Sequence, residues 1–282
     1  GLNFKPYLST ILSIGLYKIV TSLYTSLNIA WLGVVCGTIQ VGFYSTSTRL
    51  YTIIIAFFTA FTGVMFPRLS SLLSQGETKE FWEKISLSVN ALFSFAFPVL
   101  CLAIIFGPTL LHFLVGDGFE GAYLPFQIIS SLILIIGYEQ ILVIQILMPM
   151  KHDRVILRNS IAGAFVAIIL NLIIVEKMGA MGTAIVWLAS ESCVLFLSLL
   201  YLKKHSDYKF PKAEFMRYIA GHLPLVIILY ACKVLLPFND ISLLLIAGCI
   251  SLVYTYYIQI YFLQCPIVIQ TINKVHSYAK RQ

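Results

Sequence analysis

The sequence predicts an all-α membrane protein, a polytopic helical bundle of about eight transmembrane helices. Hydrophobic residues make up 59% of the 282 residues and charged residues only 11%, and the mean hydropathy is +0.91. A soluble domain of this length is far less apolar. Apolar runs of about 20 residues, the length that crosses roughly 30 Å of hydrocarbon, recur along the whole chain. The bilayer is therefore the expected environment, and no soluble domain is expected.

Eight such runs follow one another, and each is predicted to form one transmembrane helix. They cover about residues 8–35, 41–66, 86–114, 122–149, 155–175, 180–202, 217–237 and 241–263. Three prolines, Pro98, Pro125 and Pro224, lie inside these runs. They do not exclude helices, because groups on neighbouring helices can donate to the freed carbonyls, but kinks are expected there.

The first two runs carry polar stripes at three- and four-residue spacing, which places each set on one helical face. The first set is Lys18, Thr21, Thr25 and Asn28, and the second is Ser45, Thr48, Arg49, Thr52 and Thr59. Two adjacent polar stripes predict a water-accessible cavity, so these side chains are candidate substrate contacts. Interhelical hydrogen bonding is the alternative interpretation of the hydroxyl groups, since Ser and Thr commonly join membrane helices.

Ionisable residues within the runs are candidate functional positions, because charge is expensive to bury in a bilayer. At about 1.5 Å of rise per residue, Lys18, Glu139 and Glu191 lie near the midplane, whereas Arg49 lies roughly 12 Å below the outer surface. Two interpretations of the glutamates stay open. Either could form a structural ion pair with Lys18, or it could titrate as an ion-coupling site.

The fifth and sixth runs form a predicted hairpin. Gly179 and Gly182 lie around its tight turn, where the missing side chains permit close packing. Asn171 lies about one turn from the outer end of the fifth run, so we expect a helix-terminal or interhelical hydrogen bond there. In the seventh run, Lys233 lies near the outer end, and its ammonium group is expected to extend to the outer headgroups.

When the connecting segments are assigned alternately to the two sides of the membrane, the basic residues of these segments fall almost entirely on one side. One side carries only Lys177, and the other carries fifteen residues: Lys5, Arg68, Lys79, Lys84, Lys151, Arg154, Arg158, Lys203, Lys204, Lys209, Lys212, Arg217, Lys274, Lys280 and Arg281. The positive-inside rule makes the fifteen cytoplasmic. Both termini are then inside, and the net charge of +7 reflects membrane topology rather than binding to nucleic acid.

Motifs for catalysis or metal binding are not recognised in the sequence. It contains no Walker loop, no run of metal ligands and no nucleophile–histidine–acid set. The six cysteines lie in or beside apolar runs without paired spacing, which is typical of small packing residues. We therefore expect no enzyme activity, no cofactor and no metal.

Five stretches, in their order and spacing, resemble the polysaccharide-export flippases of the MATE-like multidrug/oligosaccharidyl-lipid/polysaccharide superfamily. They are YTSLNIAWLG (24–33), VGFYSTSTRLYTII (41–54), VMFPRLS (64–70), FGPTLLHFLVGDGFEGAYLPFQII (106–129) and NLIIVEKMGAMGTAI (171–185). The resemblance implies two six-helix lobes around a central cavity, often followed by two further helices. The chain is similar to the second lobe (residues 1–205) plus the extra pair with a cytoplasmic tail (206–282), so we expect a fragment that lacks the first lobe.

The resemblance also implies a function. A polyprenyl-pyrophosphate-linked oligosaccharide would be flipped by alternating access from the cytoplasmic to the outer face of the inner (plasma) membrane, for a surface polysaccharide such as O-antigen or capsule. Cations lining the cavity would face the pyrophosphate, and Arg49 occupies a motif position that is usually basic. Asn28 stands where an acid is common, so no charge-dependent role is implied there. Glycan polymerases and glycosyltransferases are the implied protein partners.

Two other functions are weighed against this one. A drug or cation antiporter of the same superfamily should have an acid-rich, aromatic cavity, whereas the polar stripes here are cationic. A non-transporting membrane scaffold in a glycan-assembly complex would be favoured if the protein consisted of a single lobe. Six further spans immediately upstream would instead favour a transporter.

Overall fold

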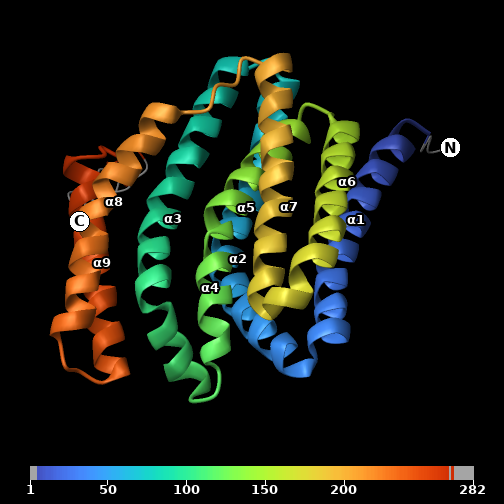
Figure 1. Cartoon of the computed structure of the whole chain (residues 1–282). Coiled ribbons are helices and arrows are strands. Elements are labelled where there is room, and N and C mark those ends of the chain that lie inside the picture. Colours follow the sequence, from blue (N-terminus) through green and yellow to red (C-terminus); the bar gives the residue numbers. More distant parts are fainter. Residues whose placement is uncertain (1–4, 267, 270–282) are drawn as a thin grey trace. The chain divides into compact units, whose positions relative to one another are not determined.

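The computed structural model describes residues 5–266, 268 and 269, and within them the chain is helical, without strands. The elements, shown in Figure 1, are α1 (Lys5–Cys36), α2 (Thr38–Ser74), α3 (Thr78–Val115), a 3₁₀ turn η1 (Glu120–Ala122), α4 (Tyr123–Ser130), α5 (Leu132–Gln140), a π-helix η2 (Ile141–Leu147), α6 (Asp153–Leu170), a π-helix η3 (Asn171–Val175), α7 (Glu176–His205), α8 (Lys212–Leu235) and α9 (Asp240–Tyr261). The predicted all-α membrane bundle is confirmed.

Seven helical stretches in the described part of the chain are long and apolar enough to cross a membrane. One of them, Asp153–His205, has 53 residues, which would extend about 80 Å as a straight helix. It folds back at Gly179, where φ is 54°, so that α6 and α7 pack side by side (Figure 1). The stretch therefore supplies two crossings, and the eight predicted spans are recovered.

The turn at Gly179 has a direct steric cause. A positive φ favours glycine because a Cβ atom is disfavoured there. A Cβ at this position would also lie 2.5 Å from Oε1 of Gln40, and that oxygen accepts a hydrogen bond of 2.9 Å from the backbone N–H of Ala180. The predicted role of Gly179 in a tight turn is confirmed.

The chain forms two compact units. Unit 1 comprises residues 1–85 and 121–209, and unit 2 comprises residues 86–120 and 210–282. In unit 1, α7 is the central helix, since it contacts α1, α2, α4, α5 and α6. The predicted division into a six-helix lobe (1–205) and a C-terminal pair of helices (206–282) stays a prediction.

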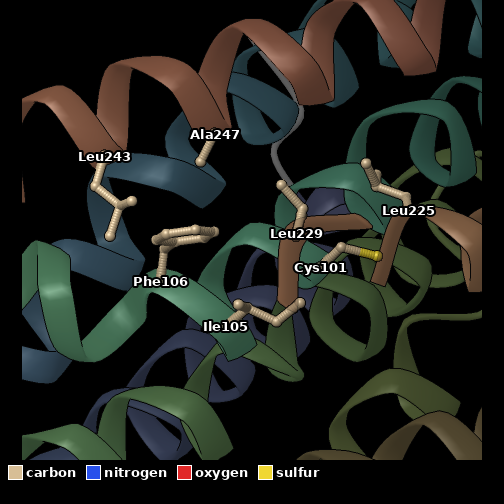
Figure 2. Close-up of a cluster of buried hydrophobic side chains, with 7 residues drawn as sticks. All are labelled: Cys101, Ile105, Phe106, Leu225, Leu229, Leu243 and Ala247. Atoms are coloured by element: carbon tan, nitrogen blue, oxygen red, sulfur yellow. The ribbon is translucent and has the colours of Figure 1, made fainter. Parts of the chain in front are cut away.

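Unit 2 has its own apolar core, which joins α3, α8 and α9. Figure 2 shows its buried side chains, Cys101, Ile105, Phe106, Leu225, Leu229, Leu243 and Ala247. Cys101 packs there as a small apolar residue, in agreement with the role predicted for the cysteines. All six cysteines are free thiols.

Side chains on other helices satisfy backbone carbonyls near two of the prolines of unit 2. Pro98 has no N–H, so it cannot donate to the carbonyl of Ser94 four residues earlier. The side-chain amide of Gln259 on α9 donates to that carbonyl instead, at 2.8 Å. Near Pro224, the hydroxyl of Tyr254 donates to the carbonyl of Gly221 at 2.7 Å. The expectation that neighbouring helices compensate for prolines is confirmed at Pro98.

The predicted extension of Lys233 to the outer headgroups stays a prediction. Its ammonium group donates a 2.7 Å hydrogen bond to the carbonyl of Ile105 within unit 2. Of the fifteen predicted cytoplasmic cations, Lys274, Lys280 and Arg281 lie outside the described residues.

Candidate functional site

Two glutamates predicted as candidate ion-coupling residues lie together inside unit 1. Glu139 comes from α5 and Glu191 from the central helix α7, and their side chains are close enough to share a hydrogen bond. Glu139 is 7% exposed and Glu191 is 5% exposed. The fold therefore buries two carboxyl groups in contact with each other, which is costly unless at least one proton is shared between them.

Glu191 is held by two hydrogen-bond donors on the same oxygen. The hydroxyl of Tyr24 on α1 donates to Oε1 at 2.6 Å, and the indole N–H of Trp187, one turn earlier on α7, donates to it at 3.0 Å. The ring of Trp187 in turn packs edge-on against Tyr51 of α2, with 5.2 Å between the ring centroids. Residues of α1, α2, α5 and α7 thus converge on one buried acidic site.

Lys18 is not part of this site. Its side chain is exposed, and its ammonium group lies 5.5 Å from the ring centroid of the adjacent Tyr17. Within the described residues, no ion pair joins Lys18 to Glu139 or Glu191. The structure therefore gives no support to the ion-pair interpretation, and the titrating interpretation stays a prediction.

Asn28 lies in a packed interface, not on the exposed polar face. Its side chain is fully buried and accepts a 2.6 Å hydrogen bond from the side-chain amide of Asn171. The same amide of Asn171 also donates to the carbonyl of Ala167 at 2.8 Å. This interaction ties α1 to the α6–η3 junction, and it confirms the interhelical hydrogen bond predicted for Asn171.

Arg49 lies on the exposed face of α2, opposite the buried face that contains Tyr44, Tyr51 and Phe58. It makes no ion pair with any carboxylate of the described chain. Thr48 is partly buried and Thr52 is exposed beside it. The fold thus brings Arg49, Thr48 and Thr52 together on α2 and leaves the guanidinium group without a carboxylate among the described residues.

Most hydroxyl groups of the two stripes are bound within their own helix. Thr21 donates to Tyr17, Thr25 to Thr21, Thr48 to Ser45 and Thr52 to Thr48, in each case to a backbone carbonyl three or four residues earlier. Thr59 differs, because its oxygen also accepts a 3.0 Å hydrogen bond from Gln140 on α5. The hydroxyl group of Thr59 therefore takes part in an interhelical hydrogen bond, whereas the hydroxyl groups of the other four threonines donate within their own helices.

Sequence reasoning missed the aromatic members of the carboxyl site. Tyr24, Tyr51 and Trp187 come from three different helices, and no spacing in the sequence relates Tyr24 to Glu191, which are 167 residues apart. Trp187 lies four residues before Glu191, so it shares a helical face with it. That spacing was the one local signal available. In the described part of the chain, no group of three or more His, Cys, Asp or Glu side chains could hold a metal ion.

Comparisons with known proteins agree with this description of a membrane bundle. A family model described as "Polysaccharide biosynthesis protein" matches residues 2–124. The chain is 24% identical, over 250 residues, to the probable low-salt glycan biosynthesis flippase Agl15 of Haloferax volcanii; the match covers 86% of the chain and 50% of that protein. No solved structure matches the chain.

A second relative is an Escherichia coli K12 protein whose name describes it as a candidate O-antigen transporter. It is 24% identical over 185 residues, which cover 65% of the chain and 44% of that protein. The chain thus spans about half the length of the curated relatives it matches. These matches confirm the resemblance predicted from the sequence: the chain is a multi-pass helical membrane protein that is similar to polysaccharide flippases.

Proposed function

We propose that the chain is part of a transporter that flips a polyprenyl-pyrophosphate-linked oligosaccharide from the cytoplasmic to the outer face of the inner membrane. The names of both relatives support transport of a glycan or O-antigen. The observation that carries the proposal is Arg49, an exposed cation that has no carboxylate partner in the described chain and lies on a membrane helix whose opposite face is buried.

The chemistry of Arg49 suits a pyrophosphate. A guanidinium group presents paired N–H donors that match two phosphate oxygens, and it stays charged at any physiological pH. Thr48 and Thr52 already donate to carbonyls of α2, so Arg49 is the donor of this group that is available to an anion. Lys18, also exposed, is proposed as a second cation toward the same substrate.

The proposed orientation follows from the distribution of basic residues. Fifteen of them fall on one side of the predicted spans, which makes that side, and both termini, cytoplasmic by the positive-inside rule. The substrate would then enter from the side on which lipid-linked precursors are assembled. Glycosyltransferases and a glycan polymerase are the proposed partners before and after transport. The relatives are named as transporters, and no catalytic step is proposed.

Substitution of Arg49 tests the proposal in the full-length protein. Arg49→Ala should abolish export of surface polysaccharide, whereas Arg49→Lys should retain part of it, because Lys keeps the charge but loses the paired donors. Surface polysaccharide and the amount of protein in the membrane are measured together. The matched control is Arg68→Ala, near the end of the same helix, where an exposed Arg68–Glu80 ion pair of 3.4 Å should contribute little.

Three results would contradict the proposal. Normal export by a well-expressed Arg49→Ala variant would exclude substrate contact at this position. Loss of folded protein in that variant, with normal export per molecule, would make Arg49 structural. Transport of organic cations in place of glycan would favour the drug or cation antiporter, and a glycan-assembly defect without any lipid transport would favour the scaffold.

A further inference from the structure

The hydrogen bonds at the carboxyl pair in unit 1 are distributed unequally between the two groups. Both donors, the hydroxyl of Tyr24 and the indole N–H of Trp187, point at one oxygen of Glu191. Two donated hydrogen bonds stabilise a carboxylate and disfavour its protonated form. The two carboxyl groups lie close enough to share a hydrogen bond. Such a bond would need a proton, and Glu139 is the group left to supply it.

Two polar atoms at the site have no hydrogen-bond partner among the described residues. One is Oε2 of Glu139, and the other is the hydroxyl of Tyr51, whose side chain is only 3% exposed. Tyr51 packs against Trp187, which holds Glu191. Buried polar atoms normally have partners, and an atom that lacks one needs an explanation, such as strain, a functional role or a bound water or ion. An unpaired carboxyl oxygen and an unpaired hydroxyl beside the acidic pair are suited to a site that binds and releases a proton.

In the described part of the chain, the helices around the pair contribute no cation to neutralise it. The tyrosines near the glutamates, Tyr24 of α1 and Tyr51 of α2 among them, are uncharged at neutral pH. Lys18 of α1 and Arg49 of α2 are exposed, and neither makes an ion pair with either glutamate. The segments α4, η2 and η3 contain no acidic or basic residue, and the charged residues of α6 lie in its first two turns. Loss of the proton would therefore leave two carboxylates facing each other without a counterion from these helices.

The helix that carries Glu139 is irregular on both sides of it. The crossing is interrupted between α4 and α5 at Ser131, and the π-helix η2 begins at Ile141, two residues after Glu139. Segments of π-helix frequently mark functional positions in membrane and soluble helices. Repulsion between the two carboxylates would thus act on a helix that already departs from regular α geometry.

We propose that Glu139 and Glu191 form a proton-binding site, in which Glu139 carries one exchangeable proton and Glu191 is the carboxylate that accepts its hydrogen bond. On release, the O–H bond of Glu139 breaks and the proton passes to water. The two carboxylates then repel each other and move α5 and η2 relative to α7. A role for this step in driving transport rests on the proposed flippase function, whereas proton binding itself does not.

Infrared difference spectroscopy of the full-length protein tests proton binding directly. Spectra recorded across a pH titration should contain the C=O stretch of one protonated carboxylic acid that disappears as the pH rises. Glu139→Gln should remove this band. Glu191→Gln should keep the band at an altered frequency, because an amide replaces the carboxylate that accepts the hydrogen bond. The matched control is Glu176→Gln, an exposed glutamate at the start of α7, which should leave the band unchanged.

Several outcomes would overturn the inference. One is the absence of any titrating carboxylic acid in the wild-type protein, and another is a band that survives Glu139→Gln. A third is loss of the band when sodium is added at constant pH, because that result would identify a metal cation as the ligand. The wild-type titration decides the matter even if a variant fails to fold.

A second measurement separates this inference from the proposed function. In vesicles with an imposed pH gradient, glycan-lipid movement by the wild type should respond to the gradient, and movement by Glu139→Gln should not. A titrating band without glycan-lipid movement would refute the flippase proposal and leave the proton site intact. Gradient-independent movement by the wild type would refute the coupling.

Discussion

The hydrogen bond from Gln259 to Ser94 gives a quantitative test of how unit 2 is held together. Gln259→Leu removes the donor and leaves the Ser94 carbonyl without a partner, because Pro98 cannot supply one. An unsatisfied buried carbonyl costs about 1–3 kcal/mol, and hydrogen bonds between membrane helices average about 0.6 kcal/mol. Gln259 is 6% exposed and Ser94 is partly buried, so we expect a loss of about 1 kcal/mol in the stability of unit 2.

Pro98→Ala changes this expectation in a defined way. Alanine restores the backbone N–H that donates to the Ser94 carbonyl, so the same Gln259→Leu substitution should then cost close to zero. The cost of Gln259→Leu should therefore differ by about 1 kcal/mol between the protein with Pro98 and the Pro98→Ala variant. This difference is the coupling energy of a double-mutant cycle, in which the effect of the greater hydrophobicity of leucine cancels.

Thiol labelling of Cys265 provides the assay. This cysteine is fully buried and its sulfur lies 3.0 Å from the hydroxyl of Ser94, so its labelling reports opening of the same region. With the other five cysteines replaced, Gln259→Leu should speed labelling about fivefold when Pro98 is present. Equal acceleration in the presence and absence of the Pro98→Ala substitution would show that the Gln259 amide does not compensate for the proline.

Two further predictions concern helix packing and topology. Gly163→Ala should destabilise unit 1 by about 1–3 kcal/mol, because its Cβ would lie 2.5 Å from Val194 and 3.2 Å from the Ser190 carbonyl. Val194→Ala should recover part of the loss, and Gly42→Ala, at a position with open space around it, is the control. Unchanged thermal stability of the Gly163→Ala variant would contradict this packing. In a protein without other cysteines, a cysteine at position 117 should be labelled from outside and one at position 207 only after permeabilisation, and the opposite pattern would reverse the topology.

The sequence predicts the elements of this fold well because the bilayer imposes strong constraints. Run length and hydropathy identify all eight crossings, and Gly179 marks the hairpin that splits the 53-residue helical stretch. Local irregularities were not predictable in the same way. The π-helices at residues 141–147 and 171–175 depend on how neighbouring helices pack, and apolar periodicity carries no signal for them.

The candidate site was predicted only in part, for a related reason. Depth in the membrane selected Glu139, Glu191, Lys18 and Arg49, because depth follows from position along a single helix. Pairing depends instead on which faces of different helices meet. The structure pairs Glu139 with Glu191 and leaves Lys18 exposed. Helical spacing likewise grouped Asn28 with Lys18, although Asn28 lies buried against Asn171.

The proposed transport activity is tested most directly by reconstituting the full-length protein in vesicles and measuring transbilayer movement of a polyprenyl-pyrophosphate-linked oligosaccharide. We predict movement that requires the protein, that is lost in Arg49→Ala, and that is retained in Arg68→Ala. Movement no faster than in protein-free vesicles, or equal movement by the wild type and Arg49→Ala, would contradict this prediction.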